Sequence, residues 1–146
     1  MRRPASSELL RICEKHGIAL VYAFGSRQED VVGMLAASVE NVEPAPMADA
    51  DVGVVFRFPL PDSVTHHKLY AAVFNDLEDL VRPLALDLVL LQQCHSVMQF
   101  EAIKGQCVYQ VSEGFRDDFE MSALRRLPDF RRILNEYNRE QLDRHV

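Results

Sequence analysis

The sequence lacks the features that mark membrane, secreted and disulfide-rich proteins. No apolar run approaches the roughly 18 residues of a membrane span, so a transmembrane protein is excluded. Met1–Pro4 leads into serine and glutamate rather than into an apolar stretch, so we expect no signal peptide. Only three cysteines occur, at Cys13, Cys94 and Cys107, and none forms a CxxC pair. We therefore expect reduced thiols in a cytoplasmic protein.

The chain also lacks an excess of basic residues. Its 16 Lys and Arg residues stand against 22 Asp and Glu residues, which gives a formal net charge of -6. This acidic balance argues against a surface that wraps nucleic acid. Internal repeats and low-complexity segments are absent, and 48% of the residues are hydrophobic. A chain of 146 residues with this composition is expected to form one compact domain with its own core.

What the sequence does contain is an alternation of helical and strand-like patterns. The expected helices cover residues 7–16, 27–38, 62–81 and 96–105, and the expected strands cover residues 18–24, 49–58, 84–91 and 107–111. The proline-containing residues 39–48 are expected to form a loop. From Ser112 an amphipathic stripe predicts a helical end that Pro128 divides.

These patterns predict an α/β (α+β) fold with a small mixed sheet of about four strands flanked by helices. Residues 1–111 would form the core of this fold. Residues 112–146 would form a C-terminal helical segment of the same single domain. The apolar pattern continues beyond Pro128 for several turns, so this end either folds back on the domain or needs another chain to cover it.

The first candidate site lies at Gly25 and Ser26, where a continuous apolar strand ends abruptly. A glycine lets the backbone approach a ligand closely, and the N-terminus of the following helix would attract a phosphate. Ser26 with Glu29 three residues later also fits a plain capping box, which needs no ligand. The two roles are compatible, and the spacing leaves both open.

Asp49 and Asp51 form the second candidate site, at the start of the second expected strand. Alternate residues of a strand face the same side, so both carboxylates project from one face. Such a pair is costly unless one member is protonated or a cation lies between them, and Mg²⁺ prefers oxygen ligands. Two solvated acids at the entry to a strand are the alternative interpretation.

Asp87 is the third candidate, and it lies inside an apolar strand where an unpaired acid is expensive. If the second and third strands are neighbours, Asp87 joins Asp49 and Asp51 around two divalent ions. Such an arrangement would flank a transferring phosphoryl group. A salt bridge to Arg27 or Arg82 is the structural alternative.

Together these segments resemble a known family. The sequence resembles the minimal nucleotidyltransferase (MNT) family, which belongs to the DNA polymerase beta superfamily. Three stretches are similar to motifs of that family: AFGSR at 23–27, ADADVGVV at 48–55 and LDLVLL at 86–91. The later segment FEAIKGQCVY at 100–109 is similar to the helix, glycine and short strand that follow the third acid in that family. The resemblance covers most of residues 18–120 and implies the nucleotidyltransferase fold.

The resemblance implies a role for each acid. Asp49, Asp51 and Asp87 would be the catalytic acids and would together hold Mg²⁺, with two ions expected. Asp87 would also position or deprotonate the attacking hydroxyl.

The resemblance assigns the nucleotide phosphates to the turn after the first strand. Gly25 and Ser26 would contact the β- and γ-phosphates of ATP. The family usually continues Gly-Ser-x-Ala-Arg-Gly, whereas here Ser26 is followed by Arg27, which is the candidate replacement contact. The segment from Ser26 to Asp49 is also longer than in the family.

The function that the resemblance implies is a magnesium-dependent transfer of AMP from ATP to a hydroxyl of a partner protein. In the family the partner is a HEPN-domain toxin, and the transferase acts as the antitoxin by adenylylating a toxin tyrosine. A small-molecule nucleotidyltransferase of the aminoglycoside-modifying type and a non-catalytic binding antitoxin are the alternatives. A homo-oligomer formed through the C-terminal helix is a further expectation.

Overall fold

The computed structural model describes residues 4–36, 48–128 and 130–144. Its elements follow the predicted alternation of helices and strands. In chain order they are α1 (Ser7–His16), β1 (Ile18–Phe24), α2 (Gln28–Leu35), β2 (Asp49–Phe56), α3 (Ser63–Glu78), β3 (Ala85–Leu90), the short 3-10 turn η1 (Leu91–Gln93), α4 (Ser96–Ile103), β4 (Gln106–Gln110), α5 (Glu113–Arg125) and α6 (Phe130–Arg144).

The four strands form one mixed sheet in the order β3-β2-β1-β4. β1 runs antiparallel to both of its neighbours, and β2 runs parallel to β3. β1 is buried along its whole length, which agrees with its unbroken apolar sequence. The prediction of a small mixed sheet flanked by helices is confirmed, and β2 and β3 are neighbours as the site hypothesis requires.

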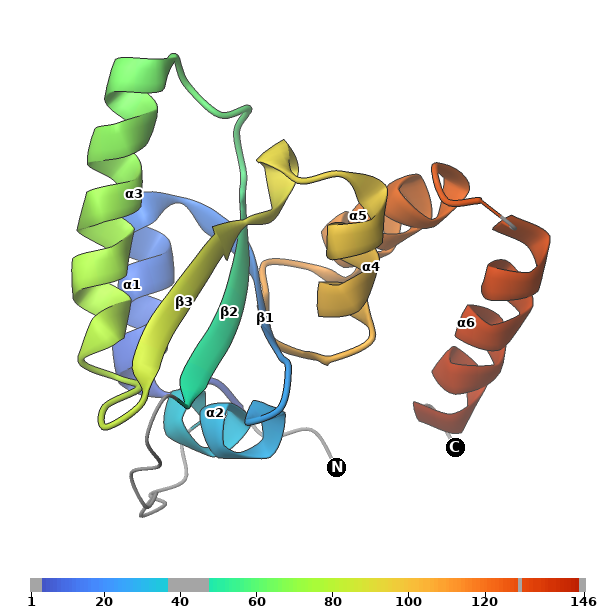
Figure 1. Cartoon of the computed structure of the whole chain (residues 1–146), viewed down its shortest axis with the longest axis horizontal. Coiled ribbons are helices and arrows are strands. Elements are labelled where there is room, and N and C mark those ends of the chain that lie inside the picture. The colour runs from blue at the N-terminus through green and yellow to red at the C-terminus, as the bar shows by residue number, and fades with distance from the viewer. Residues whose placement is uncertain (1–3, 37–47, 129, 145–146) are drawn as a thin grey trace.

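Helices cover both faces of the sheet (Figure 1). α1, α2 and α3 pack on one face, where Val52, Val54 and Phe56 of β2 enter the larger core cluster. α4 and the start of α5 pack on the other face against a second cluster that contains Tyr22 and Val55. The alternation of residues along β2 therefore divides its side chains between two cores, as the period of a strand dictates.

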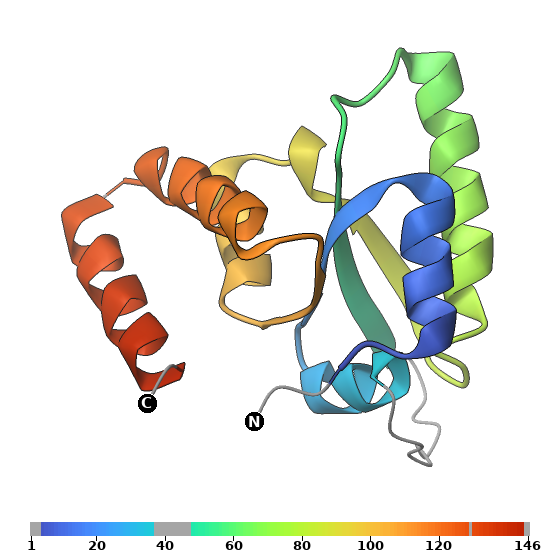
Figure 2. The same ribbon diagram turned by 180° about the vertical axis from the view of Figure 1, so that it is seen from behind.

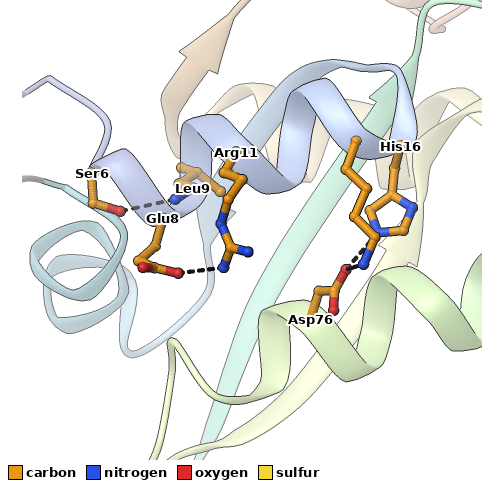
Figure 3. A network of polar contacts seen from close by, with 7 residues as sticks. Ser6, Glu8, Leu9, Arg11, His16 and Asp76 are labelled. Carbon is orange, nitrogen blue, oxygen red and sulfur yellow. Dashed lines mark hydrogen bonds and ion pairs between the residues drawn. The ribbon is translucent and has the colours of Figure 1, made fainter.

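α1 is held against α3 by a polar contact at its C-terminal end (Figure 3). The carboxylate of Asp76 on α3 accepts a hydrogen bond from Lys15 Nζ at 3.0 Å and lies 2.6 Å from His16 Nε2. The hydrogen bond from His16, followed by that from Lys15, lowers the pKa of Asp76. At the other end of α1, the Ser6 hydroxyl accepts a hydrogen bond from the Leu9 amide, which is the usual contact of a serine at the N-cap.

Several predicted boundaries move by a few residues. α2 ends at Leu35, and β2 ends at Phe56. α4 is capped by His95, whose ring accepts a hydrogen bond from the Met98 amide. Ser96 and Gln99 have the spacing of a capping box, but Ser96 is the first residue of the helix and not its cap. Most of the predicted loop at 39–48 lies outside the described residues.

The C-terminal segment is divided into α5 and α6 next to Pro128, as predicted. α6 lies beyond α5, on the far side from the sheet, in both views (Figures 1 and 2). It is anchored by Tyr137, which is 8% exposed and packs with Ala123 and Leu124 of α5. The chain therefore turns after α5 and docks α6 on the domain, which favours the folding-back alternative for this helix.

A buried carboxylate joins β1, α5 and α6. Glu120 is 0% exposed, and its oxygens accept hydrogen bonds from the hydroxyls of Tyr22 and Tyr137 and from Arg116 Nε. Burial and the nearby Glu120 carboxylate raise the pKa of both tyrosines. The ion pair with Arg116 and two hydroxyl donors compensate the cost of burying this charge.

None of the helices in the described part of the chain has the length and apolar character of a membrane span.

Candidate active site

The candidate residues from three strands meet at one end of the sheet. Because β1 is antiparallel to β2, the C-terminal end of β1 lies beside the start of β2, and Phe24 pairs with Asp51. Because β2 is parallel to β3, Asp51 lies directly beside Asp87 in the same register. Three features that are far apart in sequence are therefore neighbours at this end of the sheet. They are the Gly25–Ser26 turn, the Asp49–Asp51 pair and Asp87.

The acids project from the face of the sheet that α4 and α5 partly cover. Ala50 points into the opposite core, so Asp49 and Asp51 share the face on which Val55 meets the second cluster. Asp49 and Asp87 are exposed, and Asp51 is half-buried. At this end of the sheet the carboxylates remain accessible to a ligand.

Asp51 and Asp87 lie next to each other in register on the adjacent strands β2 and β3. Burial, hydrogen bonding to Asp87 and the negative charges of Asp87 and Asp49 raise the pKa of Asp51 from 3.8 to about 6. The cluster is thus a place where negative charge accumulates and where a proton or a cation is favoured.

Gly25 packs directly against the carboxylate of Asp51. Its φ of +83° lies in the left-handed region, and a Cβ placed on it would stand 2.0 Å from Asp51 Oδ2. A residue other than glycine would be strained and would displace the acid. The sequence-based choice of Gly25 as a site residue therefore has a structural reason in the backbone itself.

Ser26 does not cap α2. The helix begins at Gln28, its N-cap is Arg27, and no side chain makes the capping hydrogen bond. The capping box predicted for Ser26 and Glu29 is therefore wrong. Ser26 is exposed in the turn, and Arg27 Nε donates to Asp30 Oδ2 at 2.5 Å.

Because Ser26 has no capping role, its substitution separates binding from folding. Ser26→Ala is expected to change the free energy of unfolding by less than about 0.5 kcal/mol. It should weaken ATP binding by about tenfold, which corresponds to the loss of a hydrogen bond to a charged group. Thermal melting and titration with AMP-PNP measure the two effects. A large fall in melting temperature with unchanged affinity would show that Ser26 is a structural residue only.

The environment of Asp87 differs from the sequence-based expectation. β3 is an edge strand, and Asp87 is exposed rather than buried in an apolar setting. The cost of burying an unpaired acid therefore does not arise. Arg82, one of the two proposed salt-bridge partners, instead pairs with Asp79 at 3.0 Å on its own side of the β3 entry.

The arrangement of the acids bears directly on the metal hypothesis. Within residues 4–36, 48–128 and 130–144, no three His, Cys, Asp or Glu side chains converge closely enough to form a metal site as they stand. The Asp51–Asp87 pair still fits a divalent cation, because two adjacent carboxylates repel each other unless a proton or a cation lies between them. The donors at this end of the sheet are carboxylate oxygens, which suit Mg²⁺.

Comparison with known proteins gives matches among solved structures. No family model matches the chain, and no curated protein sequence matches it. A chain from the crystal structure of a toxin–antitoxin pair with AMP-PNP is 13% identical, with a TM-score of 0.54 over 95% of this chain and 97% of that one. A chain from the complex of a tri-AMPylated HEPN toxin with an MNT antitoxin, from Shewanella oneidensis, is 13% identical, with a TM-score of 0.51 over 95% and 94%.

A further match comes from a mutant of the MntA–HpeT toxin–antitoxin pair. In that protein two aspartates two positions apart are replaced by glutamate, and the matched chain is 13% identical with a TM-score of 0.52 over 95% and 97%. Likeness at this level of identity establishes a shared fold. The chain therefore shares the fold of these toxin–antitoxin structures, which is the α/β arrangement with a small mixed sheet that its sequence predicts.

Proposed function

We propose that this protein is an MNT-type nucleotidyltransferase that transfers AMP from ATP to a hydroxyl of a partner protein. The partner would be a HEPN-domain toxin and this chain its antitoxin. The observation that carries the proposal is the contact of Asp51 with Asp87 beside the glycine turn at Gly25. Further support comes from the matched chains, whose structures include one with AMP-PNP and one with a tri-AMPylated HEPN toxin.

In the proposed reaction, the acceptor oxygen forms a bond to the α-phosphorus of ATP, and the bond to the pyrophosphate oxygen breaks. Mg²⁺, when bound, would neutralise part of the negative charge on the phosphates. Asp51 and Asp87 would hold the metal, with Asp49 beside them. Asp87 would in addition orient the acceptor hydroxyl and take its proton. The backbone amides at the Gly25–Ser26 turn and the N-terminus of α2 would bind the terminal phosphates.

Arg27 completes the proposed phosphate site. Its guanidinium lies at the first turn of α2 and is oriented by the carboxylate of Asp30. A guanidinium next to a helix N-terminus is suited to a polyphosphate. No nucleophilic side chain is required, because the acceptor hydroxyl attacks the nucleotide directly.

The proposal is tested by incubating the protein with ATP and Mg²⁺, with and without the product of the neighbouring gene. We expect the partner to gain the mass of one or more adenylyl groups only when this protein and Mg²⁺ are both present. Intact-mass spectrometry followed by peptide mapping measures the gain and locates the modified hydroxyl. Neutralisation of the toxin without a mass change would instead support the non-catalytic antitoxin. If an aminoglycoside is added in place of the partner protein and gains an adenylyl group, the result would support the small-molecule enzyme.

We also propose that α6 contributes to the partner contact. Truncation after Pro128 is an unsuitable test, because it would also remove Tyr137, which anchors α6 to Glu120. Leu142 offers a cleaner test, because it is 69% exposed near the end of the helix.

Leu142→Ser is expected to leave the melting temperature unchanged and to weaken association with the partner by about tenfold. Glu140→Gln, a change at another exposed position of α6, serves as the control. Analytical ultracentrifugation of the protein alone and with its partner measures both association and self-association. If only self-association falls, the surface belongs to a homo-oligomer rather than to a toxin contact.

A further inference from the structure

Gly105 makes an unusually close backbone contact with β1. It connects the end of α4 to the start of β4, and its amide donates to the carbonyl of Ala102 at 3.0 Å. A Cβ placed on Gly105 would lie 2.3 Å from the carbonyl oxygen of Ala23 and 2.7 Å from Cβ of Phe24. An ordinary contact between carbon and oxygen is about 3.3 Å, so any side chain at this position would force a movement of roughly 1 Å.

The atoms that Gly105 approaches belong to the last residues of β1. Ala23 pairs with Gln106 of β4, and Phe24 pairs with Asp51 of β2. The end of β1 is therefore held between the α4–β4 turn on one side and the acidic strand on the other. Gly25 follows immediately and packs against Asp51 in turn.

This arrangement distinguishes Gly105 from a glycine that only allows a turn. Gly105 does not adopt a left-handed conformation, so its own backbone does not require glycine. The steric requirement comes from the main chain of β1, which cannot rotate out of the way as a flexible side chain would. Gly114, at the start of α5, has no atom within 4 Å of an added Cβ and provides a matched comparison.

We propose that Gly105 is a positioning residue for nucleotide binding, because its lack of a side chain sets the place of the Gly25–Ser26 turn relative to Asp51. The inference rests on the proposed nucleotidyltransferase function. The atoms nearest to a Cβ on Gly105 belong to Ala23 and Phe24, not to the acids. Asp51 and Asp87 are on β2 and β3, whereas β4 pairs with β1, so a change at Gly105 should affect cation binding by the acids less than it affects nucleotide binding.

The test compares Gly105→Ala with Gly114→Ala and the wild-type protein. Titration with AMP-PNP in the presence of Mg²⁺ measures nucleotide binding, and titration with Mn²⁺ alone measures cation binding by the acids. We expect Gly105→Ala to raise the Kd for AMP-PNP at least about tenfold and to leave the Kd for Mn²⁺ within about twofold, because a displacement near 1 Å disturbs a positioned ligand strongly. Gly114→Ala should change neither constant.

Two results of these titrations would overturn the inference. One is wild-type affinity of Gly105→Ala for AMP-PNP. The other is a parallel loss of affinity for AMP-PNP and Mn²⁺ together with a lower melting temperature, which would indicate a general structural role. If the wild-type protein itself fails to bind AMP-PNP, the proposed function is wrong and this inference falls with it.

A second measurement needs no variant and therefore remains decisive if Gly105→Ala does not fold. Hydrogen exchange of the wild-type protein is followed with and without AMP-PNP and Mg²⁺. We expect the nucleotide to slow exchange at residues 104–106 as well as at residues 24–26. Protection confined to residues 24–26 would contradict the proposed coupling of the α4–β4 turn to the nucleotide site.

Discussion

Asp51→Asn is expected to abolish nucleotide transfer and, at the same time, to stabilise the metal-free protein at neutral pH. The loss of activity should be roughly 10³-fold or more, because a carboxylate that holds the metal is replaced by a neutral amide. The gain in stability has a separate cause. Burial, hydrogen bonding to Asp87 and the charges of Asp87 and Asp49 raise the pKa of Asp51. A neutral amide removes both the cost of burying an ionised group and the repulsion from the two neighbouring acids.

The stabilisation should depend on pH in a defined direction. The pKa of Asp51 is about 6 in the folded protein and near 3.8 when unfolded. Well below pH 3.8 the group is protonated in both states and has no effect. Between about pH 4 and pH 6 the unfolded state ionises first, so the wild type loses stability as the pH rises, and the loss is complete above pH 6. Because Asp51 is only half-buried and solvent screens part of the interaction, we expect a gain of about 1 kcal/mol above pH 7. This gain is smaller than the value that a shift of about two pKa units would give in a dry interior.

Urea denaturation at about pH 4 and pH 7.5 measures this dependence. Asp118→Asn is the control, because Asp118 is exposed on α5 and carries the same charge. It should retain activity and show no such gain in stability. Adding Mg²⁺ should stabilise the wild type at pH 7.5 and have a smaller effect on Asp51→Asn. Full activity of Asp51→Asn, or equal Mg²⁺ stabilisation of both proteins, would refute the proposed metal site.

Glu120→Gln is expected to destabilise the protein more than any of the other substitutions proposed for it. The substitution keeps the size of the side chain but leaves Arg116, whose side chain is 12% exposed, without its buried counter-ion. Removal of one member of a buried ion pair costs about 3–5 kcal/mol, because the remaining charge stays desolvated. The hydroxyls of Tyr22 and Tyr137 also lose their ionised acceptor.

Tyr137→Phe should have a smaller and more local effect. It removes one hydrogen bond from Glu120, which corresponds to about 1–2 kcal/mol, and keeps the aromatic ring in place. Because Tyr137 anchors α6, amide exchange should accelerate over residues 130–144 while the sheet remains protected. A helix of this length is only marginally stable without tertiary contacts.

Chemical denaturation of Glu120→Gln, Tyr137→Phe and the exposed Glu140→Gln gives the comparison. Glu140→Gln should change the free energy of unfolding by less than about 0.5 kcal/mol. If Glu120→Gln were equally mild, the buried carboxylate would not join the helices to the sheet. Faster exchange throughout the protein in Tyr137→Phe would show that α6 unfolds together with the core.

The order of the elements could be predicted from the sequence because it depends on local periodicity. The unbroken apolar run at 18–24 predicted a strand, and such a run is typical of a strand covered on both faces, as β1 is. The alternation at 49–56 placed Asp49 and Asp51 on one face of a strand. Pro128 indicated the division between α5 and α6. The family resemblance added the fold, which the structural matches bear out.

The local signals for helix caps were less reliable. Ser26 and Ser96 both have the spacing of capping boxes, yet α2 and α4 are capped at Arg27 and His95. A capping motif specifies which hydrogen bonds are available, whereas the path of the chain into the helix decides which residue takes the cap position. That path depends on contacts with the rest of the fold.

The sequence by itself thus determined the types and order of the elements, the shared face of Asp49 and Asp51, and the glycine required next to them. Only the tertiary structure decided that β3 is an edge strand, so that Asp87 is exposed and lies beside Asp51 on the neighbouring strand. It also decided the approach of Gly105 to β1 and the buried contacts of Glu120. The physical reason is that periodicity acts between residues a few positions apart, whereas these contacts follow from strand order and close packing between segments distant in sequence.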